Sequence, residues 1–472
     1  MSLYLCRMAE YNPMTWENCF SSCRTGASVD SKEQRTDFQR DYDRLIFSSA
    51  FRRLQNKTQV FPLPGSTFVH NRLTHSLEVS SVGRSLGKMA GQVIAARIQL
   101  SEAGLEFYLH DLPSVIAAAC LAHDIGNPAF GHSGEDAISS YFRQHACQEI
   151  AGSPMSSRFS VAEWKELCDF EGNANAFRIL THHFSGKSSG GYRLTYATLA
   201  ATMKYPCLQQ AKNSQYRHTK KYGFFISELE TMNVLAKKVH LTPDPQAENC
   251  WFRHPFVYLT EAADDICYRI IDLEDAHRLG IVGYAETESL LLQLLNSFSS
   301  SGKEELLKTK TTLKTICDAN EKTAYLRAKV INRLIQACTD VFADQIDALL
   351  SGKFELALMD EVAHQHPVLG EIEALSVERI YSHDTVVHIE LAGYHVISKL
   401  LDLFVPAVLT PKGSRSGQQQ KAIRMLPLQY LPTGENDYEN VRLVLDYISG
   451  MTDLYATEFY QNAFGFAIPK HR

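Results

Sequence analysis

The stretch from Leu121 to Glu135 reads LAHDIGNPAFGHSGE, and it is the segment around which the rest of the fold is expected to be arranged. The pair His123-Asp124 closes a short apolar run that is compatible with a helix, and four Gly or Pro residues follow it. Such a backbone is expected to turn tightly and to return His132 and Glu135 toward the pair. Two candidate ligands at a helix end, with two more ionisable groups folded back over them, are typical of a metal-assisted hydrolase.

Helical periodicity dominates the remainder of the chain and predicts an all-α protein with little sheet. Helices are expected within 75–86, where Leu77, Val82 and Leu86 would share a face, and within 115–122, 261–279 and 323–350. Thr74 is the expected N-cap of the first of these, and Gly352 the expected stop of the last. The best strand candidate is 386–391. We expect one large helical unit, with a core over 37–285 and a helical C-terminal region, 286–472, packed on it.

Composition limits the class of protein. The 472 residues are 45% hydrophobic and 21% charged, as in an ordinary globular protein, and the net charge of −6 excludes a global basic field for nucleic acid. Eleven cysteines without a CxxC pair indicate reduced thiols, and the N-terminus lacks the pattern of a signal peptide. No apolar run approaches about 18 residues, so we expect a cytoplasmic chain without a membrane span.

One ion needs more protein ligands than a single His-Asp pair supplies. Upstream, His75 follows Arg72 at the expected start of a helix. Downstream, the adjacent carboxylates Asp264 and Asp265 lie in a largely apolar helical segment. Because a buried carboxylate is costly without a partner, a metal ion is one way of neutralising this pair.

Six stretches, in order, resemble the HD superfamily of metal-dependent phosphohydrolases and, within it, the bacterial deoxyguanosine triphosphate triphosphohydrolases. The resemblance extends from about residue 37 to about residue 458. The HD dipeptide alone would be a weak signal, whereas six ordered motifs are a strong one. They are FRRLQNKTQVFP at 51–62, RLTHS at 72–76, HDIGNP at 123–128, FEGNA at 170–174, EAADDI at 261–266 and YISGMTDLYA at 447–456.

The resemblance implies hydrolysis of a dNTP to a deoxynucleoside and inorganic triphosphate, with water attacking the α-phosphorus. Because the leaving 5′-oxygen is strongly basic, the reaction needs a proton donor, charge neutralisation or both. His132 and Glu135 match the catalytic pair of the family, and their spacing would let Glu135 fix the tautomer of His132 and raise its basicity. Whether His132 donates a proton or steers the water is open at this point.

Four residues match the metal positions, with Asp264 preferred over Asp265: His75, His123, Asp124 and Asp264.

This mixed set of nitrogen and oxygen ligands suits a divalent cation, with Mg²⁺ or Mn²⁺ preferred and Co²⁺, Ni²⁺, Fe²⁺ or Zn²⁺ also compatible. The resemblance further implies a set of substrate-binding residues. Tyr268 would stack under the deoxyribose and exclude a 2′-hydroxyl, while Asp272 would accept a hydrogen bond from the 3′-hydroxyl. Arg72 and Lys204 would bind phosphate oxygens. The remaining expected contacts are made by Gln59, Asn173 and Tyr205.

Two alternatives remain beside this interpretation. The chain could be another HD nucleotidase or phosphodiesterase, or a single-stranded nucleic-acid-binding dNTP sensor whose hydrolysis is secondary. The polar loops 209–222 and 411–421 could then supply basic contacts, although the run from Lys212 to Lys221 is more typical of a solvated loop. The resemblance also implies a homo-oligomer, such as a hexamer built from dimers, and segment 323–350 is a candidate for its interfaces.

Overall fold

The computed structural model describes residues 12–26, 34–61, 69–186, 189–298, 303–434 and 436–466. Helices form almost all of its regular structure, and the sheet is a two-stranded antiparallel hairpin of β1 (Glu149–Ile150) and β2 (Ser153–Pro154). The expectation of an all-α protein with little sheet is therefore confirmed. Most of the N-terminal stretch that was expected not to be a signal peptide, including Cys6, lies outside the described residues, and the ten described cysteines are free thiols.

The α-helices have the following bounds: α2 (Asp37–Ile46), α3 (Ser49–Arg53), α4 (Arg72–Arg97), α5 (Glu102–Glu106), α6 (Leu112–Ala122), α7 (Gly131–Gln144), α8 (Val161–Leu167), α9 (Gly172–Thr181), α10 (Tyr196–Thr202), α11 (Leu229–Lys238), α12 (Val257–Arg278), α13 (Tyr284–Ser297), α14 (Lys303–Thr315), α15 (Ala319–Asp344), α16 (Ile346–Leu350), α17 (Leu358–Gln365), α18 (Val368–Leu375), α19 (Asp384–Leu409), α20 (Gly417–Met425), α21 (Asp437–Ser449) and α22 (Asp453–Ala463). Short 3₁₀ or π turns are η1 (Leu54–Asn56), η2 (Phe107–Asp111), η3 (Met155–Arg158), η4 (Gln209–Ala211), η5 (Arg217–Thr219), η6 (Ile226–Glu228), η7 (Ser376–Ile380), η8 (Lys412–Ser414) and η9 (Leu428–Tyr430).

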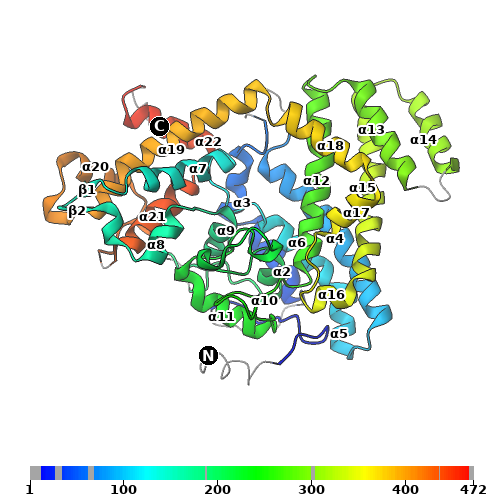
Figure 1. Ribbon diagram of the computed structural model, residues 1–472, viewed down its shortest axis with the longest axis horizontal. Helices are drawn as coiled ribbons and strands as arrows, with labels where there is room; N and C mark the ends of the chain where they lie inside the picture. The colour runs from blue at the N-terminus through cyan, green and yellow to red at the C-terminus, as the bar shows by residue number, and fades with distance from the viewer. Residues whose placement is uncertain are drawn as a thin grey trace.

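Two hydrophobic cores hold the helices together. The larger core surrounds α6, which packs along α4 and is crossed by α12. The smaller core joins α7 and α8 to the C-terminal helices α19–α22. Figure 1 shows α19 extending along the upper edge of the molecule, from the region of α18 to that of α20. The apolar run that was predicted to form a helix over 115–122 is thus the central helix α6, and the proposed domain division near residue 285 stays a prediction.

Three local expectations are wrong. Segment 386–391 is helical and lies in α19, because its β-branched residues are overruled by packing of that helix against α7 and α21. The N-cap of α4 is Asn71, whose side chain accepts from the Thr74 amide in a capping box. Leu77 is exposed because it lies off the buried face of α4, whereas Val82 and Leu86 are buried as expected. In addition, the helix predicted over 323–350 is interrupted at Gln345, and its apolar side is buried against α12, α13 and α4.

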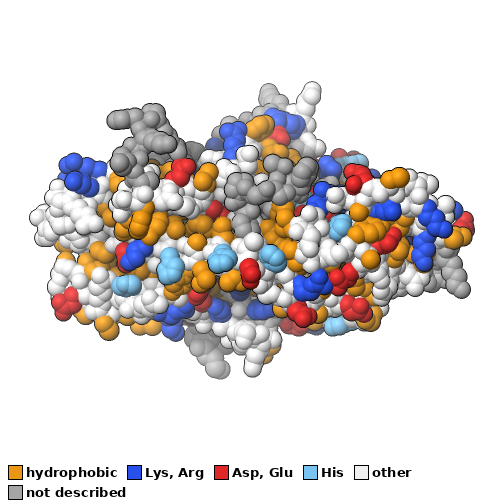
Figure 2. Space-filling model, turned by 90° about the horizontal axis from the view of Figure 1, so that it is seen from above, with side chains coloured by type: hydrophobic (Ala, Val, Ile, Leu, Met, Phe, Trp, Pro, Cys, Tyr) orange, Lys and Arg blue, Asp and Glu red, His pale blue; other side chains and the backbone are white. Residues whose placement is uncertain are grey.

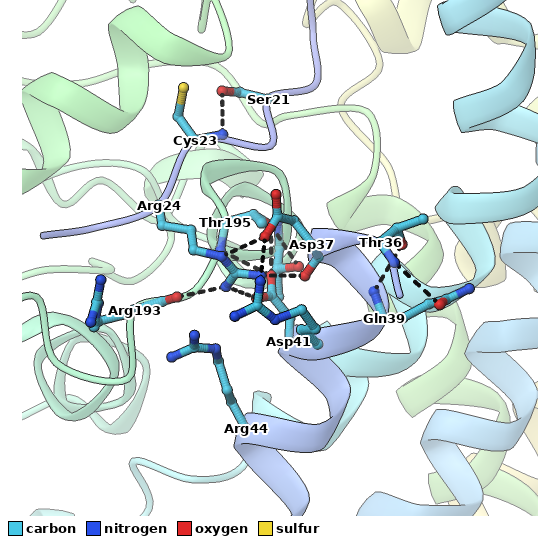
Figure 3. A network of polar contacts seen from close by, with 12 residues as sticks. Ser21, Cys23, Arg24, Thr36, Asp37, Gln39, Asp41, Arg44, Arg193 and Thr195 are labelled. Carbon is cyan, nitrogen blue, oxygen red and sulfur yellow. Dashed lines mark hydrogen bonds and ion pairs between the residues drawn. The ribbon is translucent and has the colours of Figure 1, made fainter. Parts of the chain in front are cut away.

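One arginine joins the N-terminal segment to α2. Arg24 lies between α2 and the loop before α10, and Figure 3 shows its guanidinium directed at Asp37 and Asp41 while it also donates to the carbonyl of Arg193. Asp41 is fully buried and accepts two further hydrogen bonds, from the amide and hydroxyl of Thr195. Burial raises the pKa of Asp41, and Arg24 opposes this rise.

Two helical segments are long and apolar enough to span a membrane when judged by length and composition alone. They are Glu102–Ala122, which is 67% buried within the molecule, and Asp384–Leu409, which is 50% buried. Core helices of globular proteins satisfy the same test, so this finding is weak support for a membrane span. Both segments pack against other helices of the fold.

Replacing Arg24 by alanine is expected to lower the free energy of unfolding by about 3 kcal/mol, because Asp41 would remain buried without its cation. Urea denaturation followed by circular dichroism measures this change. The control is Lys308→Ala, which breaks an exposed pair with Glu304 and should change stability by less than about 0.5 kcal/mol. Equal effects of the two variants would contradict the assigned role of Arg24.

Candidate active site

Three of the four predicted metal ligands converge from three different helices. His75 comes from the first turn of α4, His123 from the end of α6, and Asp264 from α12. The Asp264 carboxylate oxygen lies 3.1 Å from His75 Nε2 and 3.4 Å from His123 Nε2. One ligand atom from each residue lies within 4.8 Å of the other two. Residues separated by up to 189 positions in the sequence are thus brought to one point.

The donor atoms of this group fit a divalent cation. His123 Nδ1 is 2.6 Å from the carbonyl of Cys120, which leaves Nε2 directed at Asp264, and His123 Nε2 is buried without a hydrogen-bond partner. Burial opposes ionisation of both His123 and Asp264. The neighbouring carboxylates nevertheless raise the pKa of His123 to about 9, and the two imidazoles hold the pKa of Asp264 well below its usual range.

Asp124, the fourth predicted ligand, lies beside this group, with an oxygen 3.7 Å from His123 Nε2. Its carboxylate accepts from Arg72 Nη1 at 2.6 Å and from Asn127 Nδ2 at 2.6 Å. Burial would raise the pKa of Asp124, but Arg72 and the two histidines lower it. A guanidinium that was predicted to bind phosphate is therefore in direct contact with a predicted metal ligand.

The return loop between α6 and α7 is held by the C-terminal region. Its tightest point is Phe130, in the left-handed conformation with φ 62°. The Asp453 carboxylate accepts from the Phe130 amide at 2.9 Å and from the Thr58 amide at 2.8 Å. Lys57 is buried and donates to the carbonyls of Asn127 and Ser449. Sequence reasoning assigned no role to Lys57 or Asp453, although both lie in the quoted motifs.

Two glycines of this loop are required by close approach. A side chain at Gly126 would collide with the backbone of α9, where a Cβ would lie 2.1 Å from the carbonyl oxygen of Gly172. Gly131 has φ 57°, and a Cβ there would lie 2.7 Å from an Arg72 guanidinium nitrogen. The loop therefore packs against α9 on one side and against Arg72 on the other.

His132 and Glu135 lie at the start of α7, but no hydrogen bond joins them. Glu135 instead accepts from the Gly172 amide at 2.7 Å, and burial together with the nearby charge of Glu171 raises its pKa to about 7. The His132 residue is exposed at the surface, while its neighbours partly desolvate its ring. Desolvation of its ring and the charges of Lys221 and Arg72 lower its pKa, which is opposite to the rise in basicity that was expected.

Lys221 is a residue of this site that sequence reasoning missed. Its ammonium lies 3.3 Å from Glu171, whose carboxylate also accepts from Asn173 Nδ2. The run from Lys212 to Lys221 was interpreted as a solvated loop, and for Lys221 this is wrong. The only signal in the sequence was the excess of basic residues, which does not reveal where each side chain points.

A second group of cations surrounds Glu261, one helical turn before Asp264. The buried Glu261 carboxylate pairs with Lys204 at 3.2 Å, Arg217 at 3.0 Å and Arg253 at 2.8 Å. These three cations overcome the effect of burial and lower the pKa of Glu261. The predicted phosphate ligand Lys204 is thereby fixed beside the metal-ligand helix, with the buried Tyr205 next to it in the chain.

The remaining predicted residues lie along α12 and near Thr58. Tyr268 is 40% exposed and stacks on Tyr381, with ring centroids 5.6 Å apart. The Tyr381 hydroxyl donates to the buried Asp272 at 2.8 Å, so the sequence missed a third member of this cluster. Gln59 is partly buried, and its carbonyl oxygen has no hydrogen-bond partner among the described residues.

Asp272→Asn is expected to stabilise the protein increasingly as pH rises from 5 to 8. Burial raises the pKa of Asp272 to about 8. Between about pH 4 and pH 8 the unfolded chain therefore loses this proton while the folded chain keeps it, so wild-type stability falls across this window. Since one pKa unit corresponds to about 1.4 kcal/mol, removing the ionisable group should increase the free energy of unfolding by up to about 5 kcal/mol at pH 8 and by about 1–2 kcal/mol at pH 5. Denaturant titration at both values measures the difference, and the exposed Asp340→Asn serves as the pH-independent control. A gain that does not grow with pH would contradict the assignment.

Comparisons with known proteins agree with this geometry. Residues 72–214 match the HD domain family, and residues 356–462 match the phosphohydrolase-associated domain. The chain is 38% identical to a deoxyguanosinetriphosphate triphosphohydrolase-like protein of Synechocystis sp., over 96% of this chain and 100% of that protein. It is 38% identical to a protein of the same description from Pseudomonas aeruginosa, over 97% and 100% of the two chains. A deoxyguanosinetriphosphate triphosphohydrolase of Salmonella enteritidis is 32% identical, over 95% of this chain and 97% of that enzyme. The chain therefore belongs to the deoxyguanosinetriphosphate triphosphohydrolase family and is a metal-dependent phosphohydrolase with an HD domain.

Proposed function

We propose that this enzyme hydrolyses a dNTP, with dGTP as the preferred substrate, to a deoxynucleoside and inorganic triphosphate. The observation that carries the proposal is the convergence of His75, His123 and Asp264 beside the cations Arg72 and Lys204. A group that attracts a divalent cation, bordered by fixed positive charges, is what a triphosphate chain requires. The family relationship supports the same reaction.

The proposed ligands of a divalent cation, Mg²⁺ or Mn²⁺, are His75, His123, Asp124 and Asp264. A bound ion of this kind neutralises phosphoryl oxygens and lowers the pKa of water. The protein contributes the fixed position of the ligands, since Cys120 orients His123 and the Asn127 amide holds Asp124.

We assign the proton-handling role at the α-phosphorus to His132. Its lowered pKa keeps the imidazole neutral at pH 7, so it is suited to orient the attacking water and accept its proton. Glu135 supports this position through the Gly172 amide, which ties α7 to the start of α9. The leaving 5′-oxygen is then stabilised by neighbouring positive charge, and Arg72, Lys204 and Lys221 are the cations assigned to the phosphate chain.

Selection for a deoxyribose is assigned to α12. Tyr268, stacked on Tyr381, offers a flat exposed ring on which the sugar would pack without room for a 2′-hydroxyl. Asp272 is assigned to the 3′-hydroxyl, and its bond from Tyr381 fixes the carboxyl in place. Gln59 would contribute the free amide oxygen to the nucleoside, and Asn173 and Tyr205 would line the phosphate side.

We further propose a cytoplasmic homo-oligomer. Exposed apolar side chains on η7 and α19, namely Val377, Val387 and Leu391, support a contact with a second copy better than segment 323–350, whose apolar side is buried.

Single-stranded DNA is a second candidate partner, as an effector of the enzyme. On the face drawn in Figure 2, however, Lys and Arg side chains are dispersed among acidic and hydrophobic ones, so this face offers no extended basic surface.

Purified protein supplied with Mg²⁺, Mn²⁺ or Co²⁺ is expected to release inorganic triphosphate from dGTP faster than from the other dNTPs. Asp264→Ala should lose both bound metal and turnover, whereas His132→Ala should retain the metal and lose about 10²–10⁴-fold in kcat. The exposed His110→Ala is the control histidine. Release of phosphate, pyrophosphate or a linear nucleotide instead of triphosphate would favour a different HD phosphohydrolase and reject the proposal.

Tyr381→Phe keeps the aromatic stack but removes the hydrogen bond to Asp272. The KM for dGTP is expected to rise about 3–10-fold with a smaller change in kcat, because one positioning hydrogen bond contributes about 1 kcal/mol. Steady-state kinetics measure the change. Tyr455→Phe removes a hydroxyl that lies 3.2 Å from the Tyr447 hydroxyl and should leave KM unchanged. A fall in kcat alone for Tyr381→Phe would place its role in chemistry rather than in substrate positioning.

A further inference from the structure

We propose that the protein contains a second, structural metal site, formed by Cys207, His218, Asp244 and Cys250, that binds Zn²⁺. These residues lie outside the HD ligand group and have no part in the proposed reaction. All four are buried, with exposed fractions of 0%, 5%, 7% and 2% in that order. Two sulfurs, one imidazole and one carboxylate are a donor set that suits tetrahedral Zn²⁺.

The distances join three of the four proposed ligands. His218 Nε2 lies 3.0 Å from an oxygen of Asp244, and the same oxygen lies 3.8 Å from Cys250 Sγ. The three ligand atoms of His218, Asp244 and Cys250 lie within 4.8 Å of one another. In a tetrahedral zinc site, ligand atoms are separated by about 3.3–3.8 Å, so little movement is needed to receive the ion.

The fourth ligand is positioned by the backbone. Cys207 and Cys250 face each other in an antiparallel bridge, and their thiols interact. The loop that carries Asp244 and Cys250 closes on itself, because the Asp244 amide donates to the Cys250 carbonyl at 2.9 Å. One Asp244 oxygen accepts from the Gln246 amide at 2.8 Å, which leaves the other directed at His218. Such support from outside the ligand group orients a metal-binding carboxylate.

Metal binding would convert both thiols to thiolates, release two protons to solvent and leave His218 as a neutral ligand. The site would contain two thiolates, one carboxylate and one divalent cation. Sulfur ligands distinguish it from the HD group, whose proposed ligands are nitrogen and oxygen only. Soft thiolates favour Zn²⁺ over Mg²⁺ or Mn²⁺, so the two sites would take different metals from the same solution.

The position of the site indicates its role. Cys207 follows Lys204 by three residues, and His218 follows Arg217 directly. Both cations pair with Glu261, one turn before Asp264 on α12. Lys221, which pairs with Glu171 near His132, is three residues after His218. A metal that joins Cys207 and His218 to the loop before α12 would therefore hold the basic segment 204–221 against the active site.

Cobalt substitution tests the proposal, since only thiolate ligands give a sulfur-to-cobalt charge-transfer band in the near ultraviolet. Reduced protein, stripped of metal and reloaded with Co²⁺, should show this band at one equivalent per chain. The band should fall to about half in Cys250→Ser and disappear in Cys207→Ser/Cys250→Ser. It should be unchanged in Cys338→Ser, which alters a buried cysteine elsewhere, on α15.

Asp264→Ala separates this proposal from the proposed function. This variant should lose the HD-site metal but keep the thiolate band and one equivalent of Zn²⁺, as measured by elemental analysis. In the same background, removal of Zn²⁺ should lower the Tm, and the double cysteine variant should abolish the Zn²⁺-dependent part of that Tm. Absence of the band in reloaded wild-type protein would overturn the proposal even if every cysteine variant failed to fold. A Cys207–Cys250 disulfide in protein purified under reducing conditions, found by mass spectrometry, would also overturn it.

Discussion

The arrangement of the helices around the candidate active site depends on the Asp264 carboxylate, which lies between two imidazoles. This carboxylate lies on a helix that is otherwise largely buried among apolar residues, and its charge is costly there unless partners are brought to it. His75 and His123 are those partners, and each is fixed to a different helix. Because α4, α6 and α12 must meet where the three side chains meet, this electrostatic requirement constrains the point of contact of three helices that apolar packing holds together in the larger core.

The C-terminal helices support the candidate active site although they supply none of the proposed metal ligands. Asp453 satisfies the amides of Thr58 and Phe130, and Lys57 satisfies the carbonyls of Asn127 and Ser449. Buried backbone groups need such partners, and here the partners come from opposite ends of the chain. The return loop that leads into His132 on α7 is therefore held in its strained path by a region more than 300 residues away in the sequence.

Ion pairs with buried carboxylates fix the positions of the cations around the site. Glu261 holds Lys204 and Arg217, and Glu171 holds Lys221. Each ion pair removes the freedom of a long side chain, which would reduce the entropic cost of binding the proposed triphosphate substrate. The proposed thiolate site would hold the basic segment 204–221 through Cys207 and His218. The segment would then be fixed both by the ion pairs of its lysine and arginine side chains and by the bound metal.

The sequence by itself determined the helical class, the His-Asp pair with its tight return, and the identity of the distant partners His75 and Asp264, because ordered motifs and helical spacing are local properties. It did not determine that segment 386–391 is helical, that Lys221 points into the site, or that His132 loses rather than gains basicity. The first depends on which neighbours α19 packs against, and the others on which charges lie near a side chain once the chain is folded. Tertiary structure decided these points because packing and electrostatic interactions act between residues that are distant in sequence and close in space.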